Sequence, residues 1–206
     1  MEEFYTLLRR YNIDNNIALL PKWTEIYREP IAPVYWSVLE NILKKLPKNF
    51  SVFEIGSGTG DLLTLIYSLG FKNISGVESD NMLCSIANEK LYHFFKIKNT
   101  VSNKIYPYKI DKPNILIQVN CVYFEGISCK EEYLSLLKKY YTNSNPDYYI
   151  VEVIDDTFVS ENSIFPQFVR LSKEDIKNTF IGKSIEYYKT YVYPTNTSSK
   201  TIYIIS

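Results

Sequence analysis

From Ser51 onward, short apolar runs alternate with amphipathic stretches of helical length. Four of the runs are predicted strands, at residues 52–53, 74–77, 114–119 and 148–154. The stretches between them carry apolar residues at helical spacing, at residues 62–69, 82–95 and 131–141. Strands that alternate with helices form a parallel sheet with helices on both faces. The pattern therefore predicts an α/β fold with a doubly wound, mostly parallel sheet.

The C-terminal segment departs from this alternation. Ser172 and Asp175 have the spacing of a capping box at the start of a short helix. Two further apolar runs, residues 185–193 and 201–205, flank a short loop. This arrangement predicts an antiparallel hairpin at the end of the chain.

Residues 1–50 read as helices, the second of which begins at Pro33. No linker rich in Pro, Gly or Ser interrupts the chain. We therefore expect a single domain over residues 1–206, made of an N-terminal helical cap (1–48) and an α/β core (49–206).

Composition excludes several other classes of protein. The 206 residues are 46% hydrophobic, and 23 basic residues balance 23 acidic ones, so no net charge attracts a polyanion such as nucleic acid. An odd number of cysteines without C-x-x-C spacing indicates a reducing compartment and no zinc site. The chain opens on Met1-Glu2-Glu3, and no uncharged run approaches the roughly 20 residues that span a bilayer. We expect a soluble, unprocessed, cytoplasmic protein.

The most informative motif is a glycine-rich turn between the first predicted strand of the sheet and the helix after it. Gly56, Gly58 and Gly60 alternate there, and such glycines allow positive φ angles and close approach of a ligand. A dinucleotide-binding turn needs a small residue at its sixth position, which here is Asp61. The Lys-Ser or Lys-Thr pair of a P-loop is also missing. The turn thus indicates a nucleotide-type ligand other than NAD or a nucleoside triphosphate.

Carboxylates surround this turn in the sequence. Glu54 ends the first strand, Asp61 opens the following helix and Glu78 ends the second strand. A pyrophosphate would be repelled by these groups, whereas a ligand with a sulfonium and an ammonium group would be attracted. Glu78 is expected to accept hydrogen bonds from both hydroxyls of a ribose.

The segment Glu54-x-Gly-x-Gly-x-Gly60, with an acid at the end of the second strand, resembles the class I S-adenosylmethionine-dependent methyltransferases over about residues 50–206. The resemblance implies a Rossmann-like, seven-stranded sheet whose last strand lies between the fifth and the sixth. It implies S-adenosylmethionine (SAM) as cofactor and S-adenosylhomocysteine (SAH) as product. The expected cofactor-binding residues are Glu54, Gly56, Ser57, Gly58, Thr59, Gly60, Glu78, Ser79, Ser102, Asn103 and Asn120.

Two positions depart from the family's pattern. No acid follows the third strand to accept from the adenine amine, so Ser102 or Asn103 is expected to do so. The fourth strand ends without the Pro-Pro-aromatic motif of amino-directed DNA methyltransferases. The resemblance nevertheless implies that Asn120 lies beside the transferred methyl group, at the carboxyl end of that strand.

The acceptor side of the site is less defined. The crowded segment from Trp23 to Trp36 is either a lid over the acceptor or packing of the cap onto the sheet. The expected acceptor-binding residues are Trp23, Tyr27, Tyr35, Trp36 and Asp155.

Other candidates have simpler interpretations. Asp155 and Asp156 could form a magnesium site with Asn120, although loop solvation or helix capping is the simpler role, and we expect no metal. His93 is expected on the surface or in packing, and the cysteines as small packing residues.

Together these features predict a SAM-dependent methyltransferase of a small molecule that accepts the methyl group on O, N or S. Because the sulfonium is already an activated leaving group, positioning supplies much of the acceleration, and no residue is identified as an acid or base. A nucleic-acid or protein methyltransferase is one alternative, and a non-catalytic SAM-binding partner protein is another.

Overall fold

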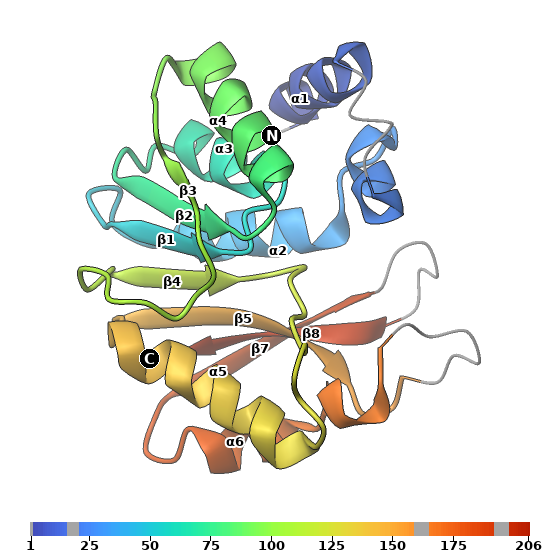
Figure 1. Ribbon diagram of the computed structural model, residues 1–206, viewed down its shortest axis with the longest axis vertical. Coiled ribbons are helices and arrows are strands. Elements are labelled where there is room, and N and C mark those ends of the chain that lie inside the picture. The colour runs from blue at the N-terminus through green and yellow to red at the C-terminus, as the bar shows by residue number, and fades with distance from the viewer. Residues whose placement is uncertain (1, 16–20, 159–164, 192–197) are drawn as a thin grey trace. The chain divides into compact units, whose positions relative to one another are not determined.

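The computed structural model describes residues 2–15, 21–158, 165–191 and 198–206. Seven of its strands follow the order β3 (Val101–Asn103), β2 (Ile74–Glu78), β1 (Val52–Ile55), β4 (Ile115–Gln118), β5 (Tyr148–Asp155), β8 (Ser198–Ile205) and β7 (Ile185–Tyr191). The short β6 (Arg170–Leu171) pairs with β5. The pairs of β8 with β5 and β7 are antiparallel, and the other recorded pairs are parallel. The predicted α/β fold with an antiparallel C-terminal hairpin is confirmed (Figure 1). The difference from the expected seven strands is the two-residue β6, Arg170–Leu171.

The chain divides into two compact units. The first comprises residues 1–50 and 57–104, and the second comprises residues 51–56 and 105–206. Each unit contains strands and helices, so this division does not follow the expected boundary at residue 48.

The first unit contains the described N-terminal helices together with two helices and two strands of the α/β core. Its elements are α1 (Glu2–Asp14), the 3-10 helix η2 (Lys22–Arg28), α2 (Val34–Leu43), α3 (Asp61–Ser68), β2 (Ile74–Glu78), α4 (Asn81–Phe95) and β3 (Val101–Asn103). Pro33 directly precedes α2, as predicted. Asp80 caps α4 with its side chain, because its carboxylate accepts from the first-turn amides of Met82 and Leu83. Within this unit α1 lies beside α4 (Figure 1), where Phe4 packs on Phe94.

The second unit contains the other strands. Its elements are β1 (Val52–Ile55), β4 (Ile115–Gln118), α5 (Lys130–Ser144), β5 (Tyr148–Asp155), η3 (Gln167–Val169), β6, α6 (Lys173–Thr179), β7 (Ile185–Tyr191) and β8 (Ser198–Ile205). Because β1, β4 and β5 are parallel neighbours, their carboxyl ends lie along one edge. The capping box of Ser172 and Asp175 is confirmed at the start of α6. Residues 192 and 193 of the predicted hairpin lie outside the described residues.

Among the helices that the structure describes, none has the length and hydropathy needed to cross a membrane.

Candidate functional site

The glycine-rich turn joins β1 to α3, and its three glycines have left-handed φ angles of 70°, 52° and 76°. Packing also excludes side chains at two of them. A Cβ on Gly56 would lie 2.2 Å from the sulfur of Cys121, and a Cβ on Gly60 would lie 2.8 Å from the Cβ of Ala87. Glycine is therefore required at Gly56 and Gly60 by backbone conformation and by close contact.

The carboxylate of Glu78 holds this turn against the end of β2 within the first unit. Its Oε2 accepts from the amide of Gly58 at 2.8 Å, and its Oε1 accepts from the amide of Asp80 at 2.9 Å and the hydroxyl of Ser79 at 3.3 Å. A carboxylate has about four acceptor positions, so one remains for a ligand. The predicted contact of Glu78 with a ribose stays a prediction.

Two further features of the first unit bear on a ligand at the turn. The hydroxyl of Ser57 is buried and has no hydrogen-bond partner in the described part of the chain. Asn103, directly opposite Glu78 in the pairing of β2 with β3, donates its amide to the carbonyls of Glu78 and Ser79 at 3.0 and 2.8 Å. These donations leave its Oδ1 as the acceptor atom on that side chain. Ser102 precedes it in β3 and is half-buried.

Asp61 does not have the expected role of surrounding the ligand. It is 2% exposed, and its Oδ2 forms an ion pair of 2.7 Å with Lys90, which is fully buried. Asp61 also accepts hydrogen bonds from Thr59 and from the side-chain amide of Asn12. Burial lowers the pKa of Lys90, and the charge of Asp61 acts against this effect. The carboxylate is thus neutralised inside the first unit.

Lys90 and Asn12 were not among the predicted site residues. One sequence signal for Lys90 exists, because it lies on the same helical stripe as the buried Leu83, Ala87 and Leu91. A lysine on an apolar stripe needs a buried partner. Asn12 is buried in α1 and also donates to the carbonyl of Tyr27 at 3.3 Å, which connects α1 to η2.

The aromatic segment before the sheet matches the packing alternative rather than the lid. Trp36 is fully buried and contacts the ring of Tyr5 at 5.3 Å. Tyr27 and Tyr35 are also buried, and their hydroxyls are 2.7 Å apart. Burial, and then the neighbouring Tyr27, raises the pKa of Tyr35 well above its usual value. The side chain of Trp23 lies outside the described part of the chain.

In the second unit, Asn120 follows β4 in the left-handed conformation, with a φ of 54°. Its backbone amide donates to Oε2 of Glu152 at 3.0 Å, and its Oδ1 accepts from Lys200 at 3.0 Å. Lys200 forms a buried ion pair of 2.9 Å with Glu152, whose other oxygen accepts from Thr190. A buried charge network therefore fixes Asn120 at the carboxyl edge of the sheet. Its predicted position beside the methyl group is untested.

Asp155 is placed differently from the expectation. Its carboxylate is 4% exposed and bonded to Lys189 at 2.9 Å and Thr201 at 2.6 Å, so it supports the hairpin rather than facing an acceptor. The next residue, Asp156, is exposed. No group of three potential metal ligands occurs among the described residues. His93 is exposed and packs on Tyr11 at 4.7 Å, as predicted.

Glu54 is buried at 2% exposure in β1, within the second unit.

Cys84 is buried, as predicted, whereas Cys121 and Cys129 are partly exposed, and all are free thiols.

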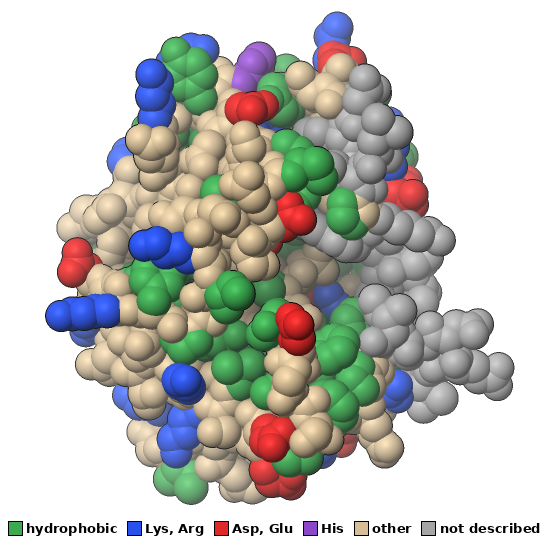
Figure 2. All heavy atoms as spheres, in the orientation of Figure 1, with side chains coloured by type: hydrophobic (Ala, Val, Ile, Leu, Met, Phe, Trp, Pro, Cys, Tyr) green, Lys and Arg blue, Asp and Glu red, His purple; other side chains and the backbone are tan. Residues whose placement is uncertain are grey.

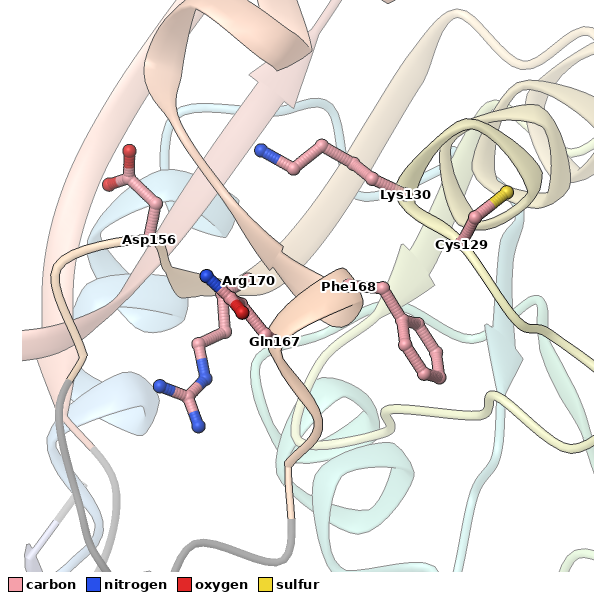
Figure 3. A pocket seen from close by; sticks show the side chains of 6 residues that line it. All are labelled: Cys129, Lys130, Asp156, Gln167, Phe168 and Arg170. Carbon is pink, nitrogen blue, oxygen red and sulfur yellow. The ribbon is translucent and has the colours of Figure 1, made fainter.

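A pocket of about 440 Å³ opens in the second unit (Figure 3). Its lining comes from the start of α5, from the residue after β5, and from η3 and β6. The lining residues are Cys129, Lys130, Asp156, Gln167, Phe168 and Arg170. None of them was a predicted acceptor-binding residue.

No protein-family model and no curated protein sequence matches the chain. Several solved structures, by contrast, are similar to it in fold. Magnesium protoporphyrin IX methyltransferase from Synechocystis PCC 6803, with bound SAH, is 14% identical with a TM-score of 0.65, and the match covers 97% of this chain and 98% of that one. A SAM-dependent methyltransferase from Clostridium acetobutylicum ATCC 824 is 12% identical with a TM-score of 0.65, covering 95% and 99%.

The methyltransferase domain of bacterial CtHen1-C is 15% identical with a TM-score of 0.59, covering 84% of this chain and 96% of that one. The shared architecture confirms that the chain has the fold of the class I SAM-dependent methyltransferases. The fold expected from the resemblance of the glycine-rich turn is thus confirmed.

Proposed function

We propose that this protein is a SAM-dependent methyltransferase that acts on a small molecule at O, N or S. The observation that carries the proposal is the glycine-rich turn, whose left-handed glycines are held at Gly58 by the carboxylate of Glu78. Backbone amides and a carboxylate at the carboxyl end of neighbouring strands are the groups that bind a nucleoside in open α/β folds. The fold likeness supports the same class of cofactor.

The residues present fit SAM. The unsatisfied hydroxyl of Ser57 offers a hydrogen bond, and Glu78 retains an acceptor position for a ribose hydroxyl. Asn103 would accept from the adenine amine through Oδ1, since its nitrogen already donates to the backbone. The cofactor residues we propose otherwise stay as predicted, with Asn120 on the acceptor side.

When bound, SAM would supply a methyl group attached to a sulfonium. After transfer of the methyl group to the acceptor, the sulfur would remain as the neutral thioether of SAH. The chain's contribution would then be mainly to hold the acceptor and exclude water. Tyr35 is unsuited to be a base at neutral pH, because burial keeps its hydroxyl protonated. Three free thiols support a reducing compartment such as the cytoplasm.

A small-molecule acceptor is favoured over a polyanion by charge. The chain has no net charge, and the face drawn in Figure 2 carries both basic and acidic side chains. Nucleic-acid binding draws most of its affinity from clustered basic groups. Incubation with SAM and metabolite pools, read by mass spectrometry, should yield a small product heavier by one methylene. Methylation of RNA or protein alone would support the alternative substrates.

Calorimetry is the first test of the cofactor. SAH and SAM are expected to bind, whereas NAD is not, because Asp61 occupies the position where a dinucleotide turn needs a small residue. Binding of NAD without any heat from SAH would overturn the proposal. SAH binding without any methylated product would leave a non-catalytic SAM-binding protein.

Glu78→Ala is expected to weaken SAH binding by about 1.5–3 kcal/mol, the contribution of a charged hydrogen bond. This loss of binding free energy has two sources. The ribose loses its hydrogen-bond acceptor, and the Gly58 amide loses the carboxylate that holds the turn. Glu78→Gln is the matched control, because it keeps one acceptor oxygen and should lose less. Equal affinity of wild type and Glu78→Ala in calorimetry would place the ribose contact elsewhere.

A further inference from the structure

The pocket in the second unit has the size of a small-ligand site. Its volume of about 440 Å³ falls within the range of about 300–1,000 Å³ that such sites occupy. Asp156 follows β5, Arg170 belongs to β6 and Cys129 precedes α5. The pocket therefore lies beside the carboxyl end of β5, at the edge where α/β sheets bind ligands.

Arg170 brings to this pocket a positive charge that has no negative partner among the described residues. Its two terminal nitrogens donate to the carbonyls of Phe158 at 2.6 Å and Phe165 at 2.9 Å. These carbonyls orient the guanidinium, but they carry no formal charge to balance it. Its Nε is buried without a hydrogen bond, and no carboxylate forms an ion pair with it within the described ranges. By contrast, Lys130 is paired with Asp175 at 3.0 Å.

Asp156 brings the opposite charge, and its carboxylate is likewise unpaired within the described part of the chain. Its backbone amide bonds to the carbonyl of Leu171 at 3.2 Å, but its carboxylate has no hydrogen bond or ion pair to any residue that the structure describes. The Asp156 carboxylate and the Arg170 guanidinium point in different directions (Figure 3). The two opposite charges that line the pocket, those of Asp156 and Arg170, therefore do not form an ion pair with each other.

The pocket lining also includes an aromatic ring, that of Phe168, which lies to one side of the two charged groups (Figure 3). Phe168 is held edge-on by Phe124, with ring centroids 6.2 Å apart. A ring fixed in this way can stack on a planar ligand. The amide of Gln167 adds a neutral polar group to the same lining.

We propose that this pocket binds the methyl acceptor, and that the acceptor is a small aromatic acid with a hydroxyl group away from its anionic group. The inference rests on the proposed function. The anionic group pairs with Arg170, the hydroxyl donates to Asp156, and the ring packs on Phe168. Charge pairing at a partly enclosed arginine gives selectivity for the anion over a neutral analogue.

The test uses simple probes on the full chain, titrated with and without SAH and followed by ligand-observed NMR. Para-hydroxybenzoate should bind at least about tenfold more tightly than para-cresol, the factor that a charged hydrogen bond of about 1.4 kcal/mol gives. Equal binding of para-hydroxybenzoate and para-cresol would overturn the proposal.

Two variants assign the selectivity to residues. Asp156→Asn should abolish the preference for para-hydroxybenzoate over benzoate, while the exposed Asp111→Asn is the matched control and should retain it. Arg170→Gln should abolish the preference for the anion. Arg170 also donates to two backbone carbonyls, so the thermal melting of the Arg170→Gln variant is measured as well. If this variant unfolds, the Asp156→Asn variant and the wild-type probe series decide between the outcomes.

The outcomes also separate this inference from the cofactor. SAH binding with no selectivity among the probes contradicts the pocket assignment and leaves the proposed methyltransferase intact. Selective probe binding that persists without any SAH binding contradicts the proposed function, and the pocket is then not an acceptor site for methyl transfer.

Discussion

Lys90→Met is expected to lower the free energy of unfolding by about 3–5 kcal/mol, the loss found when one partner of a buried ion pair is removed. The substitution keeps a long apolar stem but leaves the carboxylate of Asp61 in a site that is 2% exposed. Hydrogen bonds from Asn12 and Thr59 remain, but they do not supply a counter-charge. Urea unfolding followed by circular dichroism measures the difference.

The control removes both charges. In the double variant Asp61→Asn, Lys90→Met, no buried charge is left unpaired, so its stability loss should be smaller than that of Lys90→Met alone. A double variant less stable than the single one would show that the Asp61 carboxylate stabilises the fold through its hydrogen bonds with Asn12 and Thr59 rather than through the charge of Lys90.

This ion pair shows where reasoning from the sequence ends. The alternation of strands and helices, the capping box and the C-terminal hairpin were predictable because each depends on neighbouring residues. Asp61 was assigned to the ligand because it directly follows the glycine-rich turn. Two of its partners lie far away in the sequence, Asn12 before it and Lys90 after it. The sequence predicted that the Asp61 carboxylate lies beside the glycine-rich turn. Its neutralisation by Lys90 becomes visible only when α1 and α4 pack on α3.

The end of β5 shows a second limit. Residues that alternate along a strand point to opposite faces, so a shift of one position exchanges their surroundings. The sequence favoured Asp155 as the acceptor-side carboxylate, but hairpin residues Lys189 and Thr201 bind it. Asp156 lines the pocket instead. Which of two adjacent acids is free depends on the register of β8 against β5, which the sequence does not specify.

Deletion of residues 1–30 has the largest expected effect. The deletion removes α1 and η2, and with them the buried side chains of Tyr5, Leu8 and Tyr27. At about 1.5–3 kcal/mol for each buried apolar side chain, the loss is roughly 5–9 kcal/mol. A domain's whole stability is about 5–15 kcal/mol. We therefore expect the truncated chain to be largely unfolded at room temperature, without a cooperative thermal transition.

The same experiment decides between packing and a lid. A lid could be removed with little change in melting temperature, and SAH would still raise that temperature while methyl transfer was lost. Packing predicts that stability and SAH affinity fall together, because Trp36 loses the ring of Tyr5 and Asp61 loses the amide of Asn12. Leu7→Ala is the control within the same helix, since Leu7 is 58% exposed and its loss should leave melting unchanged. A truncated chain that melts like the full chain and still binds SAH would contradict the packing role of the N-terminal helices.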